Sequence, residues 1–241
     1  MTLPRVQIPT YHLSIPSSKK KITYRPFLVK EEKILLMAME SASEKDMASA
    51  LNQIITNCIL SKDFDVSELA TFDIEYIFLQ LRSKSVGEIA EPIIHCEKCE
   101  KDVPLKIDLS KVKMKFTKSH KKDIQLDKEI GVTMKYPDIV QLAEYGLSQT
   151  DGQGSETIEK VYSLIKSCVE SIWTSDERYQ MRDTPDEELE DFLSSLGTDH
   201  YQKIQEFFDT MPALEHKAKY KCEHCEFEGT VIIRGLQDFF I

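Results

Sequence analysis

Three stretches in the N-terminal third of the chain predict helices, one from its composition and two from the spacing of their apolar residues. Residues 29–41 mix Leu and Met with Glu and Lys, which favour helix. Residues 44–60 and 73–81 each place their apolar side chains along one face of a helix. Before them, the proline-rich residues 1–25 predict an extended arm that ends in a strand around Ile22.

The second half of the chain shows the helical pattern again. Apolar positions from Ile158 to Ile172 form a stripe over four turns and predict the clearest helix. A capping box that begins at Thr184 predicts another helix through Leu193. Further helices are expected over residues 137–146, where Pro137 suits a first turn, and over residues 199–209.

Strand-like stretches flank two Cys-x-x-Cys turns. Residues 89–94 and 103–109 surround the first turn, and residues 217–221 and 229–233 surround the second. Each set predicts a small antiparallel hairpin with the cysteines at its tip. Residues 132–136 predict one more strand.

These elements predict an α+β fold that is mainly α-helical, with about half of the residues in helices. We expect a helical scaffold and two β-hairpin zinc knuckles joined into one zinc-ribbon-like site. The segments are expected to form one integrated domain. They are an arm and helical region over residues 1–88, a first knuckle and basic segment over 89–136, a second helical region over 137–212, and a second knuckle with an apolar tail over 213–241.

The four paired cysteines carry the most specific chemical signal. Cys96 and Cys99 form one pair, and Cys222 and Cys225 form the other. Structural zinc prefers four ligands in a tetrahedron, and thiolates are preferred donors. The pairs are far apart in the sequence, so a shared zinc site requires that the fold bring them together. A closed four-cysteine site leaves no position for water, which indicates structure and not hydrolysis.

Other interpretations of the cysteines and nearby histidines stay open. Each pair could be a redox motif, although no βαβ pattern accompanies it. The four residues could also be free thiols, or the remains of a lost site. His95 and His224 lie in or beside the motifs and could replace a ligand, but we expect them to be exposed or to support the site. Cys58 and Cys168 lie on apolar helix faces and are expected in the core.

Charge and hydropathy limit the classes of function. The chain has 241 residues, 41% of them hydrophobic, and a formal net charge of −10. An acidic protein is a poor candidate for duplex nucleic acid, although a lysine-rich stretch at 101–122 and an acidic stretch at 170–191 could each steer a partner. No apolar run approaches the length of a membrane span, and no signal peptide is recognisable, so we expect a cytoplasmic protein without membrane contact.

No motif for catalysis is recognisable. The chain lacks the zinc-protease, serine-hydrolase and phosphate-loop signatures. We therefore expect a protein that is not an enzyme and that has no small-molecule substrate.

Two long stretches, together with the paired knuckles, resemble a known family. They are residues 24–41 (Tyr-Arg-Pro-Phe-Leu-Val-Lys through Met-Glu-Ser) and residues 72–88 (Phe-Asp-Ile-Glu-Tyr through Val-Gly-Glu). Together they look like the baseplate hub assembly proteins of T-even-type contractile-tailed bacteriophages. The likeness is densest over residues 1–110 and thinner through residues 111–210.

The resemblance implies a late viral protein that acts in the host cytoplasm during tail morphogenesis. Its partners would be other baseplate hub or tape-measure proteins. The family includes both a hub subunit, which the virion baseplate would retain, and a factor that promotes hub assembly without covalent chemistry. Length and the complete second knuckle favour the assembly factor. An alternative of another class is a zinc-ribbon nucleic-acid module that contacts phosphate through Lys111 to Lys122.

Residues within the resemblance are the first candidates for a docking surface, because they combine aromatic, arginine and charged side chains. Phe78 and Leu81 lie on an apolar face and are expected in the core instead. The apolar C-terminal tail could pack on its own core or bind a partner. The partner-binding candidates are Arg25, Phe27, Arg82, Lys84, Glu88, Phe239 and Phe240.

Overall fold

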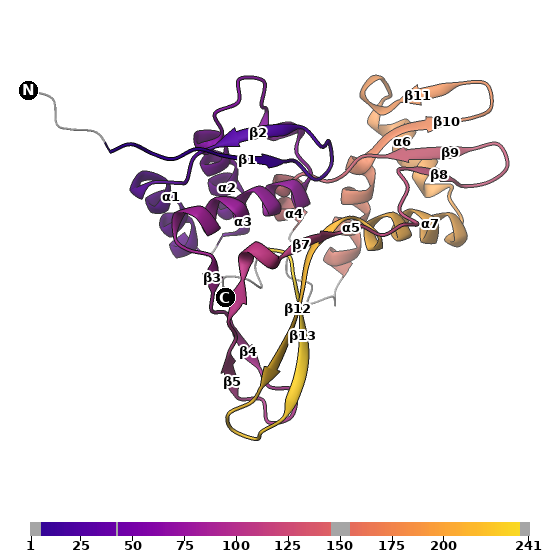
Figure 1. Cartoon of the computed structure of the whole chain (residues 1–241). Helices are drawn as coiled ribbons and strands as arrows, with labels where there is room; N and C mark the ends of the chain where they lie inside the picture. The colour runs from indigo at the N-terminus through magenta and orange to yellow at the C-terminus, as the bar shows by residue number, and fades with distance from the viewer. Residues whose placement is uncertain (1–5, 42, 146–154, 237–241) are drawn as a thin grey trace, which may run out of the picture. The chain divides into compact units, whose positions relative to one another are not determined.

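The computed structural model divides the chain into two compact units, drawn in Figure 1. Unit 1 comprises residues 1–115 together with 213–241, and unit 2 comprises residues 116–212. Each unit has its own helices and strands and is described by itself. The structure describes residues 6–41, 43–145 and 155–236.

Unit 2 is inserted between two segments of unit 1. Strand β7 (Lys113–Lys115) lies directly before the insertion, and strand β12 (Ala213–Lys221) begins directly after it. The two strands pair antiparallel, with Lys115 opposite Ala213. The chain therefore leaves and re-enters unit 1 at neighbouring positions of one sheet.

Unit 1 begins with a hairpin and three helices. Helix α2 follows Ser43, whose side chain accepts a hydrogen bond from the backbone N–H of Asp46 and so caps the helix. Its apolar face is buried, as the spacing predicts, and includes Leu51, Ile54 and Ile55. The elements are β1 (Tyr11–Ser14), β2 (Lys21–Tyr24), α1 (Val29–Ser41), α2 (Glu44–Cys58), the 3₁₀ helix η1 (Val66–Glu68) and α3 (Thr71–Ser85).

A buried carboxylate fixes the start of α3. Asp73 is fully buried, and its side chain accepts hydrogen bonds from the backbone N–H groups of Ala70 (3.3 Å) and Ser17 (2.9 Å). Burial raises the pKa of Asp73, and these hydrogen bonds oppose the rise. The carboxylate thus ties the turn after β1 to the first turn of the helix.

The rest of unit 1 is built from strands. Two short ribbons join β3 (Ile89–Ala90) to β6 (Ile107–Asp108) and β4 (Ile93–His95) to β5 (Asp102–Pro104). The 3₁₀ helix η2 (Leu109–Lys111) leads to β7. A three-stranded antiparallel sheet has the order β13-β12-β7, where β13 spans Glu228–Arg234.

Unit 2 combines a four-stranded antiparallel sheet with four helices. The strand order is β11-β10-β9-β8. The buried core gathers side chains from the sheet and from α5, α6 and α7, among them Val132, Met134, Ile165, Ile204 and Phe207. The elements are β8 (Asp123–Gln125), β9 (Gly131–Met134), α4 (Ile139–Tyr145), α5 (Ser155–Cys168), β10 (Val169–Trp173), β11 (Arg178–Gln180), the 3₁₀ helix η3 (Met181–Asp183), α6 (Asp186–Ser194) and α7 (Thr198–Asp209).

A glycine lets the only tryptophan of the chain lie against its neighbouring strand. Gly131 on β9 pairs with Trp173 on β10, and a Cβ at Gly131 would lie 2.2 Å from the indole ring. Real Cβ atoms do not come so close to other carbon atoms. Any other residue at this position would displace the ring.

The expectation of a mainly α-helical chain is wrong. The described residues form seven α-helices and also thirteen strands, arranged in five small antiparallel sheets. Most of the unpredicted strand content lies in unit 2, where β8 and β11 have only three residues each. Strands this short carry little periodicity, so their pattern does not distinguish them from loops.

Two helix boundaries also differ from the prediction. The apolar stripe expected to be one helix through Ile172 is divided, because α5 ends at Cys168 and β10 begins at Val169. Pairing with β9 explains this, since Val169 lies opposite Met134. The predicted capping box of α6 is absent: Pro185 is the N-cap, and the Thr184 hydroxyl donates to the carbonyl of Gln180. None of the described helices has the length and apolar composition that a membrane-spanning helix needs.

Candidate metal centre

Each Cys-x-x-Cys turn closes the tip of a hairpin. In the first, the N–H of Cys96 donates to the carbonyl of Lys101 (2.9 Å), and the N–H of Glu100 donates to the carbonyl of Cys96 (2.8 Å). In the second, the same bonds join Cys222 to Phe227 (2.8 Å) and Glu226 to Cys222 (3.0 Å). The two turns therefore have the same backbone construction.

A glutamate in the left-handed conformation follows each pair. Glu100 and Glu226 both have φ of 58°, a conformation that costs a non-glycine residue about 1–2 kcal/mol. The same strained residue at the same place in both turns indicates that the turn geometry outweighs this cost. The repeated Cys-x-x-Cys-Glu motif is visible in the sequence, and it is the signal that could have revealed the shared turn.

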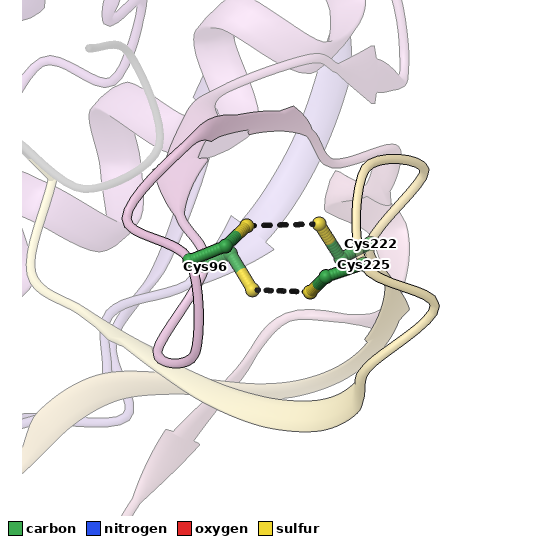
Figure 2. A group of neighbouring side chains, drawn as sticks. Cys96, Cys222 and Cys225 are labelled. Carbon is green, nitrogen blue, oxygen red and sulfur yellow. Dashed lines mark hydrogen bonds between the residues drawn. The ribbon is translucent and has the colours of Figure 1, made fainter.

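The fold brings the four cysteines together, as Figure 2 shows for Cys96 opposite the second hairpin. The sulfur atoms of Cys96 and Cys225 lie 3.7 Å apart, and those of Cys99 and Cys222 lie 3.6 Å apart. All four sulfur atoms lie within 4.8 Å of one another. Cysteines that are more than 120 residues apart in sequence thus share one cluster.

The distances between the sulfur atoms fit a metal ion better than a disulfide. A disulfide bond is about 2.05 Å long, and all six cysteines of the chain are free. Four sulfurs each ~2.3 Å from one tetrahedral ion would lie ~3.8 Å from one another, close to the two measured separations. The donor set and its spacing therefore fit a tetrahedral metal centre.

Ionisation is unequal within the cluster. Burial disfavours the thiolate of Cys96, but backbone N–H groups of Lys98 and Cys99, together with the neighbouring thiols, lower its pKa to about 6. For Cys225, an N–H from Phe227 favours the thiolate, whereas burial and the other three sulfurs raise the pKa to about 12. The thiolate of Cys96 thus forms readily, and negative charge on the neighbouring sulfurs disfavours ionisation of Cys225. A bound cation would relieve this repulsion.

A second contact holds the two hairpins together. The hydroxyl of Tyr220 on β12 accepts a hydrogen bond from the backbone N–H of Glu97 (3.2 Å). The Tyr220 ring lies opposite Gly229 of β13, where a Cβ would approach it to 2.7 Å. Tyr220 was not among the predicted site residues, although an aromatic residue two positions before Cys222 was available as a signal.

The histidines beside the cysteines lie outside the cluster. His95 has an exposed side chain, and its Nδ1 lies 2.8 Å from a carboxylate oxygen of Asp102 on the paired strand. His224 is exposed as well. The other two cysteines, Cys58 and Cys168, are fully buried, and burial raises the pKa of each thiol to about 11. Both are therefore inert core residues.

The structure places Arg25 and Phe27 inside unit 1. The guanidinium of Arg25 donates to Glu31 Oε1 (3.0 Å), to Glu31 Oε2 (3.3 Å) and to the carbonyl of Asn57 (2.9 Å), and the Glu31 side chain is fully buried. Phe27 is buried and stacks on Phe78 with ring centroids 6.3 Å apart. These contacts describe core positions, and a partner-binding role for either residue stays a prediction.

The remaining partner-binding candidates lie at the end of α3 or beyond the described residues. Lys84 and Glu88 form an exposed ion pair at 2.5 Å. Arg82 is half-buried, donates to the carbonyl of Gly87, and has a pKa that burial lowers. Phe239 and Phe240 lie outside the described residues.

Comparison with known proteins covers almost the whole chain. A family described as "T4 bacteriophage base plate protein" matches residues 8–241. The chain is also similar to the "Baseplate hub assembly protein gp26" of Enterobacteria phage T4, with 22% identity over 230 residues, 95% of this chain and 97% of that protein. No solved structure matches it. The chain belongs to the T4 bacteriophage base plate protein family.

Proposed function

We propose that the protein is a non-enzymatic factor that promotes assembly of the phage baseplate hub. The similarity to a T4 protein named for hub assembly, which spans 95% of the chain, carries this proposal. The partners would be other hub or tape-measure proteins, met in the host cytoplasm during tail assembly. The alternative within the same family is a subunit that the finished baseplate retains.

The cysteine cluster would hold a structural zinc ion in this role. Cys96 and Cys99 from one hairpin and Cys222 and Cys225 from the other would be its ligands. The four-thiolate donor set supports zinc, because soft sulfur ligands in a tetrahedron suit this ion. All four positions would be filled by protein, so the ion would join the β4–β5 ribbon to the β12–β13 hairpin and contribute to folding.

Elemental analysis tests the metal. Purified protein is expected to contain one zinc per chain, and Cys99→Ser is expected to lose it. Cys168→Ser is the matched control, because it removes a thiol from the other unit and leaves the four ligands intact. Full zinc content in Cys99→Ser, or another metal in the unaltered protein, would contradict the assignment.

Inactivation of the gene in the phage that encodes it tests the assembly role. Infected cells are expected to accumulate heads without functional tails, visible by electron microscopy. Mass spectrometry of purified wild-type virions then separates the two family roles. An assembly factor is expected to be absent from virions or far below the amount of the hub proteins, whereas a retained subunit is present in equal amount. Normal tails without the gene product would refute both.

A further inference from the structure

The charge of the chain is divided unequally between its two units. Unit 2 carries 20 acidic and 10 basic side chains, so the whole formal charge of −10 lies there. Unit 1 carries 21 of each and is formally neutral. The acidic units 2 of two molecules repel one another. Unit 1 is neutral and has a basic surface, so it can approach unit 2 of another molecule without this electrostatic repulsion.

Unit 1 has such a basic surface on the sheet β13-β12-β7. Alternate residues of β12 point to opposite faces. One face buries Leu214, Ala218 and Tyr220. The other carries the lysine row, which we define as Lys217, Lys219 and Lys221, and all three side chains are exposed.

Neighbouring strands extend the positive charge on the same face. The register places Lys113 and Arg234 opposite Glu215, and Lys115 opposite Ala213. Glu215 is half-buried and pairs with both Lys115 (2.8 Å) and Arg234 (3.3 Å), so its charge is already compensated. Within the lysine row, Lys217 and Lys219 lie opposite Ile232 and Thr230 of β13, and Lys221 lies opposite the carboxylate of Glu228.

Helix α6 of unit 2 presents an acidic surface whose side chains repeat at a spacing similar to that of the lysine row. Leu189 and Leu193 are buried, so the opposite side of this helix faces solvent. We define the α6 acidic face as Glu187, Glu188 and Asp191, which lie on that side and are exposed. The other two acids of the helix, Asp186 and Glu190, already contact Lys166 at 3.2 and 3.3 Å.

The two surfaces match in spacing as well as in sign. Alternate residues of a strand repeat every ~6.7 Å, and residues one helical turn apart repeat every ~6 Å. Glu187 and Asp191 are separated by one such turn, so they can face two successive lysines of the row. We propose that two copies of this chain associate head to tail, with the lysine row of one copy against the α6 acidic face of the next.

Nucleic acid fits this basic face less well. Proteins that bind single strands stack bases on aromatic rings, and the register places no aromatic side chain on the lysine-row face of these three strands. The residues opposite the row are Ile232, Thr230 and Glu228, which offer an exposed apolar side chain and a carboxylate. Glu228 lies at the end of the row, opposite Lys221, so a phosphate chain along the whole row would meet its carboxylate, whereas an acidic face that contacts Lys217 and Lys219 would not.

Sedimentation equilibrium of the full chain tests the proposal. At ~0.1 mM protein and low salt we expect masses above that of a monomer, and monomer at ~1 M salt, where exposed pairs are screened. Lys217→Glu with Lys219→Glu should abolish the association, and so should Glu187→Gln with Glu188→Gln and Asp191→Asn. Lys221 is left intact because it adjoins Cys222. Lys33→Glu with Lys62→Glu is the matched control and should associate normally.

A mixture of the two altered proteins decides between head-to-tail pairing and other contacts. Each retains one intact surface, so an equimolar mixture should form a dimer that grows no further. A monomeric unaltered protein at low salt, or a mixture that stays monomeric, would overturn the proposal. Co-sedimentation of the unaltered protein with single-stranded or duplex DNA, lost in Lys217→Glu with Lys219→Glu, would also overturn it in favour of nucleic acid. None of these readouts requires tail assembly, so they fail independently of the proposed function.

Discussion

Unit 1 is made from both ends of the chain, whereas unit 2 is one continuous stretch. The sheet of unit 1 pairs β7 with β12 across the whole insertion, and its four clustered cysteines come from hairpins on either side of that insertion. Unit 2 buries its core between one sheet and its helices, and unit 1 has a buried core of its own. Folding of unit 1 must close a long loop, which is entropically costly. A metal clamp would offset part of this cost, which the continuous unit 2 does not bear.

Loss of a cysteine ligand should have the largest effect and should be confined to unit 1. Cys222→Ser is expected to lower the stability of unit 1 by several kcal/mol, because metal binding of ~10–16 kcal/mol contributes directly to folding in small sites. Hydrogen exchange of α3 and β12 measures unit 1, and fluorescence of Trp173 measures unit 2. Cys168→Ser should instead destabilise unit 2. Unchanged exchange in unit 1 of Cys222→Ser would refute the clamp.

Disruption of the buried ion pair of unit 1 should cause the second-largest loss of stability. Arg25→Ala removes the main partner of Glu31, whose side chain is fully buried. We expect a loss of ~3 kcal/mol, at the low end for a broken buried pair, because Lys30 (3.3 Å) and the N–H of Leu28 (2.9 Å) still contact the carboxylate.

Lys84→Ala is the comparison for Arg25→Ala, because it breaks the exposed pair with Glu88 and should cost at most ~1 kcal/mol. Urea unfolding measures both variants. A stable Arg25→Ala that fails to support tail assembly would favour the partner-binding role of Arg25 over its structural one.

A small cavity created by mutation in the core of unit 2 would test whether the two units unfold independently. Ile204 is fully buried in the core, and Ile204→Val removes one methyl group. We expect a loss of ~1 kcal/mol, measured through Trp173 fluorescence. Hydrogen exchange in unit 1 and thiol accessibility of Cys96 should not change. A shift of both units together would show that they unfold cooperatively.

The contrast between local signals and the pairing of distant segments explains which features the sequence could predict. Helix α1 matches its predicted bounds because it is rich in residues that favour helix. Helix α2 differs only at its end, because its N-cap and apolar spacing are local signals. The grouping of the four cysteines was predicted because donor type and Cys-x-x-Cys spacing are chemical signals, although only the fold shows that the pairs meet. Local physics therefore accounts for the helices and the candidate ligands.

Features that depend on distant pairing were missed. The boundary between α5 and β10 depends on β9, more than 30 residues earlier, which turns the apolar stripe at Val169 into a strand. Neither β7 nor β12 carries a local sequence signal for its pairing with the other strand. The pattern along the chain therefore does not reveal that the two ends of the chain share a unit. The net charge of the whole chain likewise does not reveal that unit 1 is neutral and that unit 2 is acidic.

A half-buried histidine of unit 2 leads to the smallest expected effect, a dependence on pH. The Nδ1 of His120 lies 2.9 Å from the hydroxyl of Thr210, and its Nε2 lies 3.0 Å from the hydroxyl of Tyr136. The Thr210 hydroxyl donates to the carbonyl of Glu206 and can only accept from His120. The Nδ1 atom therefore carries the proton, and Nε2 accepts from Tyr136.

Protonation of Nε2 would turn this atom from an acceptor into a donor, so the Tyr136 hydroxyl could no longer donate to it and would have to accept instead. Burial and then the nearby charge of Lys122 lower the pKa of His120 in the folded protein. The unfolded chain, with an ordinary pKa of ~6.5, binds the proton more readily, so unit 2 should be fully stable above that pH and lose stability as the pH falls through the lowered folded value. Urea unfolding followed by Trp173 fluorescence at pH ~7.5 and ~5.5 measures this loss within unit 2 alone, whatever happens to the cysteine cluster. His120→Gln removes the titrating group and should flatten the dependence; an equal slope in that variant would assign it to other groups.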